Sequence, residues 1–193
     1  MSAILRLLLA LPALAARAEP PLAAAVRQVR YTSECRELVR TQDNVSYPVP
    51  ARTERGPRWR LLFYPAMPGG RPGDLAAHGP SLAAEFGTDG RDLRCGALFA
   101  LPPGDRAQAL GPVRSPEGRR LGDAAFLARE AELYDALAAA AEAFFSGKTG
   151  PAARRTAADV LRLFTLVSEP GLKAHYRAMS PEFWAWAQEA AKP

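Results

Sequence analysis

The segment 123-DAAFLAREAELYDALAAAAEAFFSGKTGPAARRTAADVLRLFTLV-167 decides the fold class, because its apolar residues recur with the period of an α-helix. Asp123 can cap a helix that ends at Gly147, and Pro151 fits the first turn of a second helix. The first helix carries one broad apolar stripe: Phe126, Leu127, Leu133, Tyr134, Leu137, Ala141, Phe144 and Phe145. The second is expected to bury Ala153, Ala157, Val160, Leu161, Phe164 and Val167. Apolar stripes of this width must pack against another layer of secondary structure.

The chain before this segment has a different character. Residues 45–122 hold 11 of the 18 prolines and 12 of the 15 glycines. Three short stretches alternate apolar and polar residues with a period of two, as half-buried strands do. They are VRQVRYTSECR (26–36), RWRLLFY (58–64) and DLRCGALFAL (92–101). The first can also be read as part of a helix over 22–39, because its apolar residues are loosely helix-spaced.

Together these patterns predict an α+β protein. A small antiparallel sheet within residues 27–101 is covered by a C-terminal bundle of about four helices. The two shorter helices of this bundle are expected to open at Pro170 and at Ser180-Pro181. A further short helix, interrupted by Gly79-Pro80, is expected in DLAAHGPSLAAEFG (74–87). We expect one domain over 19–193, β-rich over 19–122 and helical over 123–193.

The first 18 residues, MSAILRLLLALPALAARA, have the pattern of a secretory signal peptide. They combine Arg6, an apolar run from Leu7 to Ala15 and the small-x-small sequence Ala16-Arg17-Ala18. The run is about half of the roughly 20 residues that a membrane-spanning helix needs. An organelle transit peptide is the alternative. We therefore expect an exported protein, periplasmic or secreted, whose mature chain begins at Glu19 and has no transmembrane segment.

Cys35 and Cys95 are the only cysteines in the sequence. In an oxidising compartment such a pair predicts one disulfide. Both cysteines fall on the apolar side of their expected strands, where a buried disulfide needs them. The bond would close a loop of about 60 residues and, from loop-closure entropy, add roughly 4 kcal/mol of stability. Two free buried thiols are the alternative for a chain that is not exported.

Gly147-Lys148-Thr149 matches the last three residues of the phosphate-binding loop G-x-x-x-x-G-K-[ST]. The first glycine of that loop would fall at position 142, which is Glu142. The residues before the motif also read as a helix, whereas the loop needs a strand there. We therefore predict no nucleotide. Gly147 is expected to end one helix, and Gly150-Pro151 to start the next.

Catalytic and metal-binding patterns are weak. Only His78 and His175 could act as a general base, and His175 is expected to pack at the edge of a short helix. His78 and Ser81 lie in a glycine- and proline-rich stretch that can expose both, but the chain has no G-x-S-x-G nucleophile elbow. Two histidines and two scattered cysteines show no metal-ligand spacing. We predict no metal or other cofactor, and a secreted hydrolase that uses His78 and Ser81 is kept as an alternative.

Residues 27–60 carry eight arginines against four acidic residues. Four of these arginines fall on the polar faces of two expected strands: Arg30, Arg36, Arg58 and Arg60. If the strands are neighbours, the arginines form a patch for anionic lipid, acidic polysaccharide or an acidic protein. The net charge of +5 is too small to indicate nucleic acid. A solvated sheet face, with Glu34 and Glu37 pairing the arginines, is the alternative interpretation.

Two tryptophans near the C-terminus suggest a docking element. Trp184 and Trp186 lie about 200 degrees apart on a helix, so a single core cannot easily take both. One of them is expected near the surface, where tryptophan often anchors a partner. The alternative is a terminal helix wedged between two packed elements, which would bury both rings.

No motif in the sequence specifies an activity. We predict an exported, non-catalytic accessory or binding protein, with another envelope or extracellular protein as its partner. The hydrolase is one alternative. The other is a carrier of small ligands, with a pocket between sheet and helices, and a fully packed core would count against it.

Overall fold

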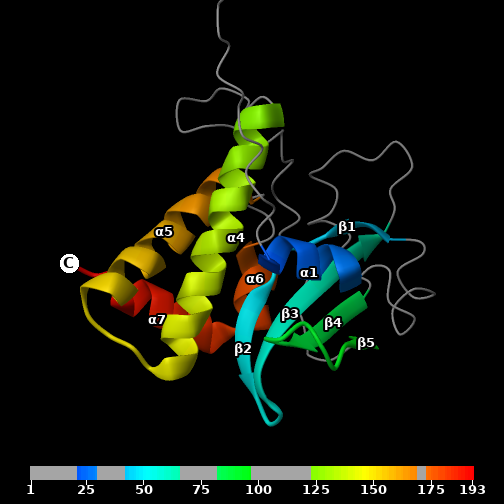
Figure 1. The fold of residues 1–193 in the computed structure, drawn as a ribbon, viewed down its shortest axis with the longest axis horizontal. Helices are drawn as coiled ribbons and strands as arrows, with labels where there is room; N and C mark the ends of the chain where they lie inside the picture. The colour runs from blue at the N-terminus through cyan, green and yellow to red at the C-terminus, as the bar shows by residue number, and fades with distance from the viewer. Residues whose placement is uncertain (1–20, 30–41, 66–81, 97–122, 169–172) are drawn as a thin grey trace, which may run out of the picture.

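The computed structural model describes residues 21–29, 42–65, 82–96, 123–168 and 173–193. These residues form an α+β fold in which helices pack on a small antiparallel sheet (Figure 1). The fold class predicted from the sequence is confirmed. The strands come from the first part of the chain and most of the helices from the part after residue 123, where the hydrophobic period changes.

The sheet is a meander of neighbouring antiparallel strands. Its strands are β1 (Gln42–Val45), β2 (Val49–Thr53), β3 (Gly56–Pro65), β4 (Leu82–Gly87) and β5 (Arg94–Gly96). β3 is central, β4 pairs with it, and β5 pairs with β4. β1 and β2 both pair with β3, at successive positions: Val45 lies opposite Phe63, and Val49 lies opposite Arg60. They therefore form a single interrupted edge strand.

A tight turn joins β2 to β3. Thr53 pairs with Gly56, so Glu54 and Arg55 are the loop. Gly56 has a φ of 90°, a conformation that residues with a side chain rarely adopt. The Thr53 hydroxyl accepts a hydrogen bond from the Arg55 N–H at 3.2 Å and donates one to the Gly56 carbonyl at 3.0 Å. β1 and β2 were not predicted from the sequence, because their residues are polar or interrupted by proline.

The helices are α1 (Pro21–Val29), α4 (Asp123–Ser146), α5 (Pro151–Val167), α6 (Lys173–Met179) and α7 (Pro181–Ala190). The predicted C-terminal group of four helices is thus present. α4 packs along α5, and α5 packs against α7. α4, α6 and α7 all contact β2. In Figure 1, α1 lies in front of the sheet, and α6 lies behind the β2–β3 hairpin.

Helix side chains also bond to the outer backbone of the interrupted edge strand. The Tyr47 N–H donates to the Tyr176 hydroxyl at 3.1 Å, and the Arg52 N–H donates to Glu182 Oε1 at 3.3 Å. The Tyr47 hydroxyl in turn donates to Glu130 Oε1 at 2.8 Å. Burial, with the Glu130 carboxylate nearby, raises the pKa of Tyr47, so this hydroxyl remains a donor across the physiological range.

The end of α4 is where the sequence predicted it. Gly147 has a φ of 64°. Its N–H donates to the Phe144 carbonyl at 3.3 Å, and the Lys148 N–H donates to the Ala143 carbonyl at 3.0 Å. A left-handed residue with these two bonds is a Schellman motif, which glycine favours. Pro151 then opens α5. The Gly-Lys-Thr sequence is therefore the connection between two helices.

Two predictions about the first part of the chain are wrong. The strand expected over 26–36 is helical through Val29, because α1 buries Leu22, Val26 and Val29 on one face. The helical alternative is correct for α1, and residues 30–41 lie outside the described part of the chain. The helix expected in 74–87 is also wrong for its last six residues, which form β4.

The other strand predictions agree with the structure. The strand predicted over 58–64 lies within β3 and is confirmed. The one predicted over 92–101 is present as β5, and residues 97–101 lie outside the described part. In β4, Ala83 and Ala84 favour helix locally, but pairing with β3 and burial override that preference.

β3 contributes to the core from both of its faces. Trp59, Leu61 and Phe63 are buried on one face, in agreement with the period of two in residues 58–64. Arg58 and Leu62 alternate with them and are buried too. The expectation of a solvated second face is therefore wrong for these two residues.

Candidate functional site

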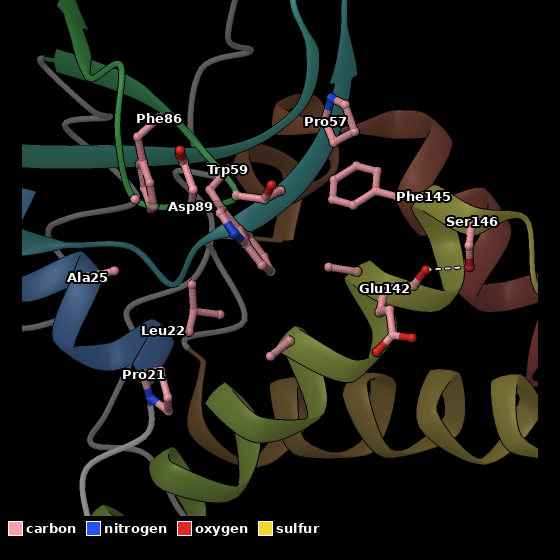
Figure 2. A pocket seen from close by; sticks show the side chains of 14 residues that line it. Pro21, Leu22, Ala25, Pro57, Trp59, Phe86, Asp89, Glu142, Phe145 and Ser146 are labelled. Carbon is pink, nitrogen blue, oxygen red and sulfur yellow. Dashed lines mark hydrogen bonds between the residues drawn. The ribbon is translucent and has the colours of Figure 1, made fainter.

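A groove of about 740 Å³ opens between α1, the sheet and α4 (Figure 2). Three segments that are distant in sequence form its walls. The lining residues are Pro21, Leu22 and Ala25 of α1; Pro57, Trp59 and Phe86 of the sheet; Thr88, Asp89 and Gly90 of the β4–β5 turn; and Ala138, Ala141, Glu142, Phe145 and Ser146 of α4. Most of these side chains are apolar or small, so the groove suits an apolar group.

Trp59 is the central residue of the groove. It lies on β3 directly opposite Phe86 of β4, and both side chains are almost completely buried. Figure 2 shows the Trp59 ring projecting into the space between α1 and α4, with Leu22 below it. A large aromatic ring held by a sheet and flanked by two helices forms a rigid part of the groove wall.

The indole N–H of Trp59 is a hydrogen-bond donor at this site. Only 5 % of the residue is exposed, yet no described residue accepts a hydrogen bond from this N–H. The acceptor atom of a ligand in the groove can therefore pair with this donor.

Small side chains on α4 leave the space that the groove occupies. Ala138 and Ala141 face it from consecutive turns of the helix, and larger residues at these positions would fill it. Phe145, one turn further, forms the end of the groove and packs against Phe144 with ring centroids 5.3 Å apart. The groove is therefore a consequence of the alanine-rich sequence of α4.

The charged residues that line the groove, Asp89 and Glu142, are both acidic. The Lys148 ammonium lies 2.6 Å from Glu142 Oε1. Its hydrogen bond lowers the pKa of Glu142, so the carboxyl is ionised at neutral pH. Asp89 Oδ1 accepts the Arg91 N–H at 3.0 Å. The rim thus favours neutral or cationic ligands over anions.

The turn that places Asp89 depends on Gly87. A Cβ added at Gly87 would lie 2.6 Å from Asp89 Oδ1 and 3.2 Å from the Arg91 carbonyl oxygen. The Gly87 N–H donates to that carbonyl at 2.7 Å. Backbone and side chain therefore meet closely here, and a residue with a side chain would shift the rim of the groove.

Two of the four arginines predicted to form an anionic-partner patch lie in the described part of the chain, and both are engaged internally. Arg58 Nε lies 3.1 Å from Glu85 Oε1, and Arg60 Nε lies 3.2 Å from Glu85 Oε2. Arg58 is buried, so it offers no exposed charge to a partner. Arg30 and Arg36 lie outside the described residues.

The two candidate docking aromatics have different surroundings. Trp184 is buried, and its indole N–H donates to the Tyr176 carbonyl at 2.6 Å. Trp186 is half-buried and stacks on Phe183 with ring centroids 5.7 Å apart. Trp184 is therefore a core residue, and Trp186 is the one of the pair that reaches the surface.

Of the two cysteines in the predicted disulfide, only Cys95 lies in the described part of the chain. Cys95 is half-buried on β5, where it lies opposite Ala84 and packs against the core. Among the described residues there is no free cysteine. Cys35, like residues 1–18, lies outside the described part of the chain, so its disulfide with Cys95 stays a prediction.

The candidate general bases and metal ligands do not form a site within the described residues. His78 and Ser81 lie outside them. His175 is fully buried rather than at the edge of its helix, which corrects the expectation from the sequence. In the described part of the chain, no three histidine, cysteine or acidic residues come close enough together to hold a metal ion.

Comparison with known proteins gives no identity. No family model matches the chain, and neither a curated protein nor a solved structure matches it significantly. Among the helices that the structure describes, none has the length and apolarity needed to cross a membrane.

A pocket between sheet and helices was predicted only as an alternative, and the residues that line the groove were not predicted, although Trp59 falls on the apolar face of an expected strand. Two signals were available. α1 was visible in the helix-spaced Leu22, Val26 and Val29, and α4 has alanines at several positions that could face the core. Neither pattern indicates that these helices stand apart over Trp59, because that depends on how the segments pack.

Proposed function

We propose that this protein is a non-catalytic binding protein and that the groove takes a small, largely apolar ligand. The observation that carries this proposal is a groove of about 740 Å³ between α1, the sheet and α4, lined mostly by apolar side chains and with Trp59 at its centre. This volume is within the range of about 300 to 1,000 Å³ that is common for small-molecule sites. A fully packed core would have counted against the carrier interpretation, and the space between sheet and helices supports it.

The lining indicates the chemistry of the ligand. Leu22, Phe86 and Phe145 offer apolar contacts, so the body of the ligand would be aliphatic or aromatic. The Trp59 N–H calls for an acceptor such as a carbonyl or ether oxygen. Asp89 and Glu142 disfavour an anionic group at the rim. A neutral apolar molecule with one acceptor atom fits these requirements best.

A pair of alanine substitutions tests the site. Ala138 lines the groove, whereas Ala139 is the next residue of the same helix, is also exposed and does not line it. Ala138→Phe is expected to weaken binding of the neutral fluorescent naphthalene ketone Prodan about tenfold or more, because the added ring occupies the groove. Ala139→Phe should bind Prodan as the parent protein does. Equal affinities in both variants, or no Prodan binding at all, would contradict the proposal.

A second variant tests the hydrogen bond. Trp59→Phe keeps an aromatic ring but removes the N–H. Its affinity for Prodan, which has a carbonyl acceptor, is expected to fall about fivefold, the effect of one hydrogen bond. Affinity for N-phenylnaphthylamine, which has no carbonyl, should change little. Equal losses for the two probes would mean that the ring and not its N–H matters.

We further propose that the protein works after export, with a disulfide between Cys35 and Cys95. The leader-like residues 1–18 and the even pair of cysteines support this. The bond would tie β5, the short strand at one edge of the sheet, to a distant segment of the chain. Mass spectrometry of the protein from its native host should show a chain that begins at Glu19 and is two hydrogens lighter than its reduced form. A chain that keeps residues 1–18, or two titratable thiols, would contradict export.

We propose another envelope or extracellular protein as the partner. Trp186 supports this most directly, because it is half-buried beside the C-terminal residues Lys192 and Pro193. Trp186→Ala should reduce capture of partners from an envelope fraction, while the core around Phe183 keeps the helix folded. Unchanged capture would remove Trp186 from consideration.

A further inference from the structure

A second hollow, of about 610 Å³, lies at the β2–β3 hairpin on the sheet face opposite Trp59. Arg60 of β3, Glu85 of β4 and Arg94 of β5 lie opposite one another in a row across three strands. The hairpin residue Arg55 lines the same hollow. Antiparallel partners point to the same side of a sheet, so these side chains converge from neighbouring strands.

Positive charge exceeds negative charge around this hollow. Glu85 is shared by Arg58 at 3.1 Å and Arg60 at 3.2 Å. Asp92 is shared by Arg58 at 2.9 Å and, more loosely, Arg94 at 3.8 Å. Two carboxylates therefore face several guanidinium groups, and they are engaged most closely by the buried Arg58.

Arg55 and Arg94 are the arginines of the hollow whose guanidinium groups are exposed enough to bind a ligand. The side chain of Arg94 is 48 % exposed, and its nearest carboxylate oxygen is 3.8 Å away. Arg55 is exposed at the tip of the hairpin. Arg52 also lines the hollow, but its guanidinium bonds to the Phe144 carbonyl and lies over the Phe144 ring. Glu54 is a further acid of the lining and reduces the surplus of charge without removing it.

We propose that this hollow binds a phosphate group, held by Arg55 and Arg94 and oriented by Arg60. Guanidinium groups present their N–H donors in a planar fork that matches two phosphate oxygens. The Arg58–Glu85–Arg60 ion pairs hold the floor of the hollow in place. Phosphate chemistry is shared by the free ion and by phospholipid headgroups, and the test distinguishes these sources. The site is separate from the apolar groove, whose Trp59 lies on the other face of β3.

The experiment compares two arginine variants with a matched control. Arg55→Gln combined with Arg94→Gln removes the two available guanidinium groups. Arg91→Gln removes the same kind of charge from an exposed position three residues from Arg94, outside the hollow. Binding is measured by titration calorimetry with inorganic phosphate and by flotation with phosphatidylglycerol vesicles, using phosphatidylcholine vesicles as the uncharged reference. Circular dichroism melting checks that each variant folds.

The double variant is expected to lose phosphate-dependent binding about tenfold or more, and Arg91→Gln to change it less than about twofold. Binding of inorganic phosphate assigns the site to a free phosphate or phosphate ester. Binding only of phosphatidylglycerol vesicles assigns it to a headgroup. Failure to bind either probe would overturn the proposal, as would equal losses in the double variant and the control.

Discussion

The two faces of β3 are both buried, but by different chemistry. On one face, Trp59, Leu61 and Phe63 lie among apolar residues. On the other, Arg58 is buried against the Glu85 carboxylate, and Arg60 donates to the Met179 carbonyl at 2.8 Å. The first face is stabilised by removing hydrocarbon from water, and the second tolerates burial because its charges are paired. An alternating strand can therefore be covered on both sides if its polar side brings its own partners.

The largest expected effect is on the apolar face. Phe63→Ala should lower the free energy of unfolding by about 3 to 5 kcal/mol, because Phe63 is fully buried and its removal leaves a cavity. Leu127→Ala is the control, since Leu127 is 60 % exposed and should matter by less than about 0.5 kcal/mol. Urea unfolding followed by circular dichroism measures both. Similar costs would mean that this face is not the core of the sheet.

The next effect comes from the charged face. Glu85→Ala removes the buried carboxylate that pairs with the buried Arg58 and should cost about 3 kcal/mol. Asp92 still pairs with Arg58, which limits the loss. Replacing both partners, Arg58→Met with Glu85→Leu, should cost less than the single change, because little unpaired charge remains buried. A double variant as unstable as Glu85→Ala would show that packing rather than charge pairing governs this face.

A smaller effect is expected at the α6–α7 junction, beside the carbonyl that Arg60 contacts. The Ser180 hydroxyl accepts the Phe183 N–H at 3.4 Å and caps α7. Ser180→Ala should cost about 1 kcal/mol. Ser146→Ala provides a comparison, since the Ser146 hydroxyl donates to the Glu142 and Ala143 carbonyls at an exposed helix end and caps no N–H group. If both substitutions are neutral, the cap does not stabilise α7.

The smallest expected effect is a dependence of stability on pH, which the charged face of β3 should show and the apolar face should not. The hydrogen bond from Arg58 lowers the pKa of Asp92 below its usual value of 3.8. The stability that Asp92 contributes is therefore complete above pH 3.8 and is lost as the pH falls through its lower folded-state pKa. The difference in stability between the parent protein and Asp92→Asn should shrink on acidification below about pH 4. The cost of Phe63→Ala, measured over the same range, should stay constant. A constant Asp92→Asn difference would contradict the ion pair.

The helices were the part of the fold most accessible from sequence. Gly147 and Pro151 mark the end of α4 and the start of α5, and both are backbone signals that act locally. Leu127 was wrongly placed in the buried stripe: it is 60 % exposed, whereas its neighbour Phe126 packs against the core. Local signals thus predicted where the helices begin and end better than which of their residues are buried.

The sheet was harder to predict, and so was the groove. β4 contains alanines that favour helix, and only its partner β3 makes it a strand. The second face of β3 appeared solvated because Arg58 and Arg60 are charged, and nothing nearby in sequence reveals that Glu85 lies opposite Arg60. Similarly, Trp59 was recognisable as a core-facing residue, but the groove beside it depends on where α1 and α4 lie. Contacts between distant segments decide all three features.

The interrupted edge strand has a consequence for self-association. Sheets polymerise when an outer strand has open N–H and C=O groups to which another chain can add. Along this edge, Glu182 and the Tyr176 hydroxyl already accept N–H groups, and helices stand beside the strand. An incoming strand would first have to displace them. This side of the molecule is therefore protected against fibril growth as long as α6 and α7 stay folded.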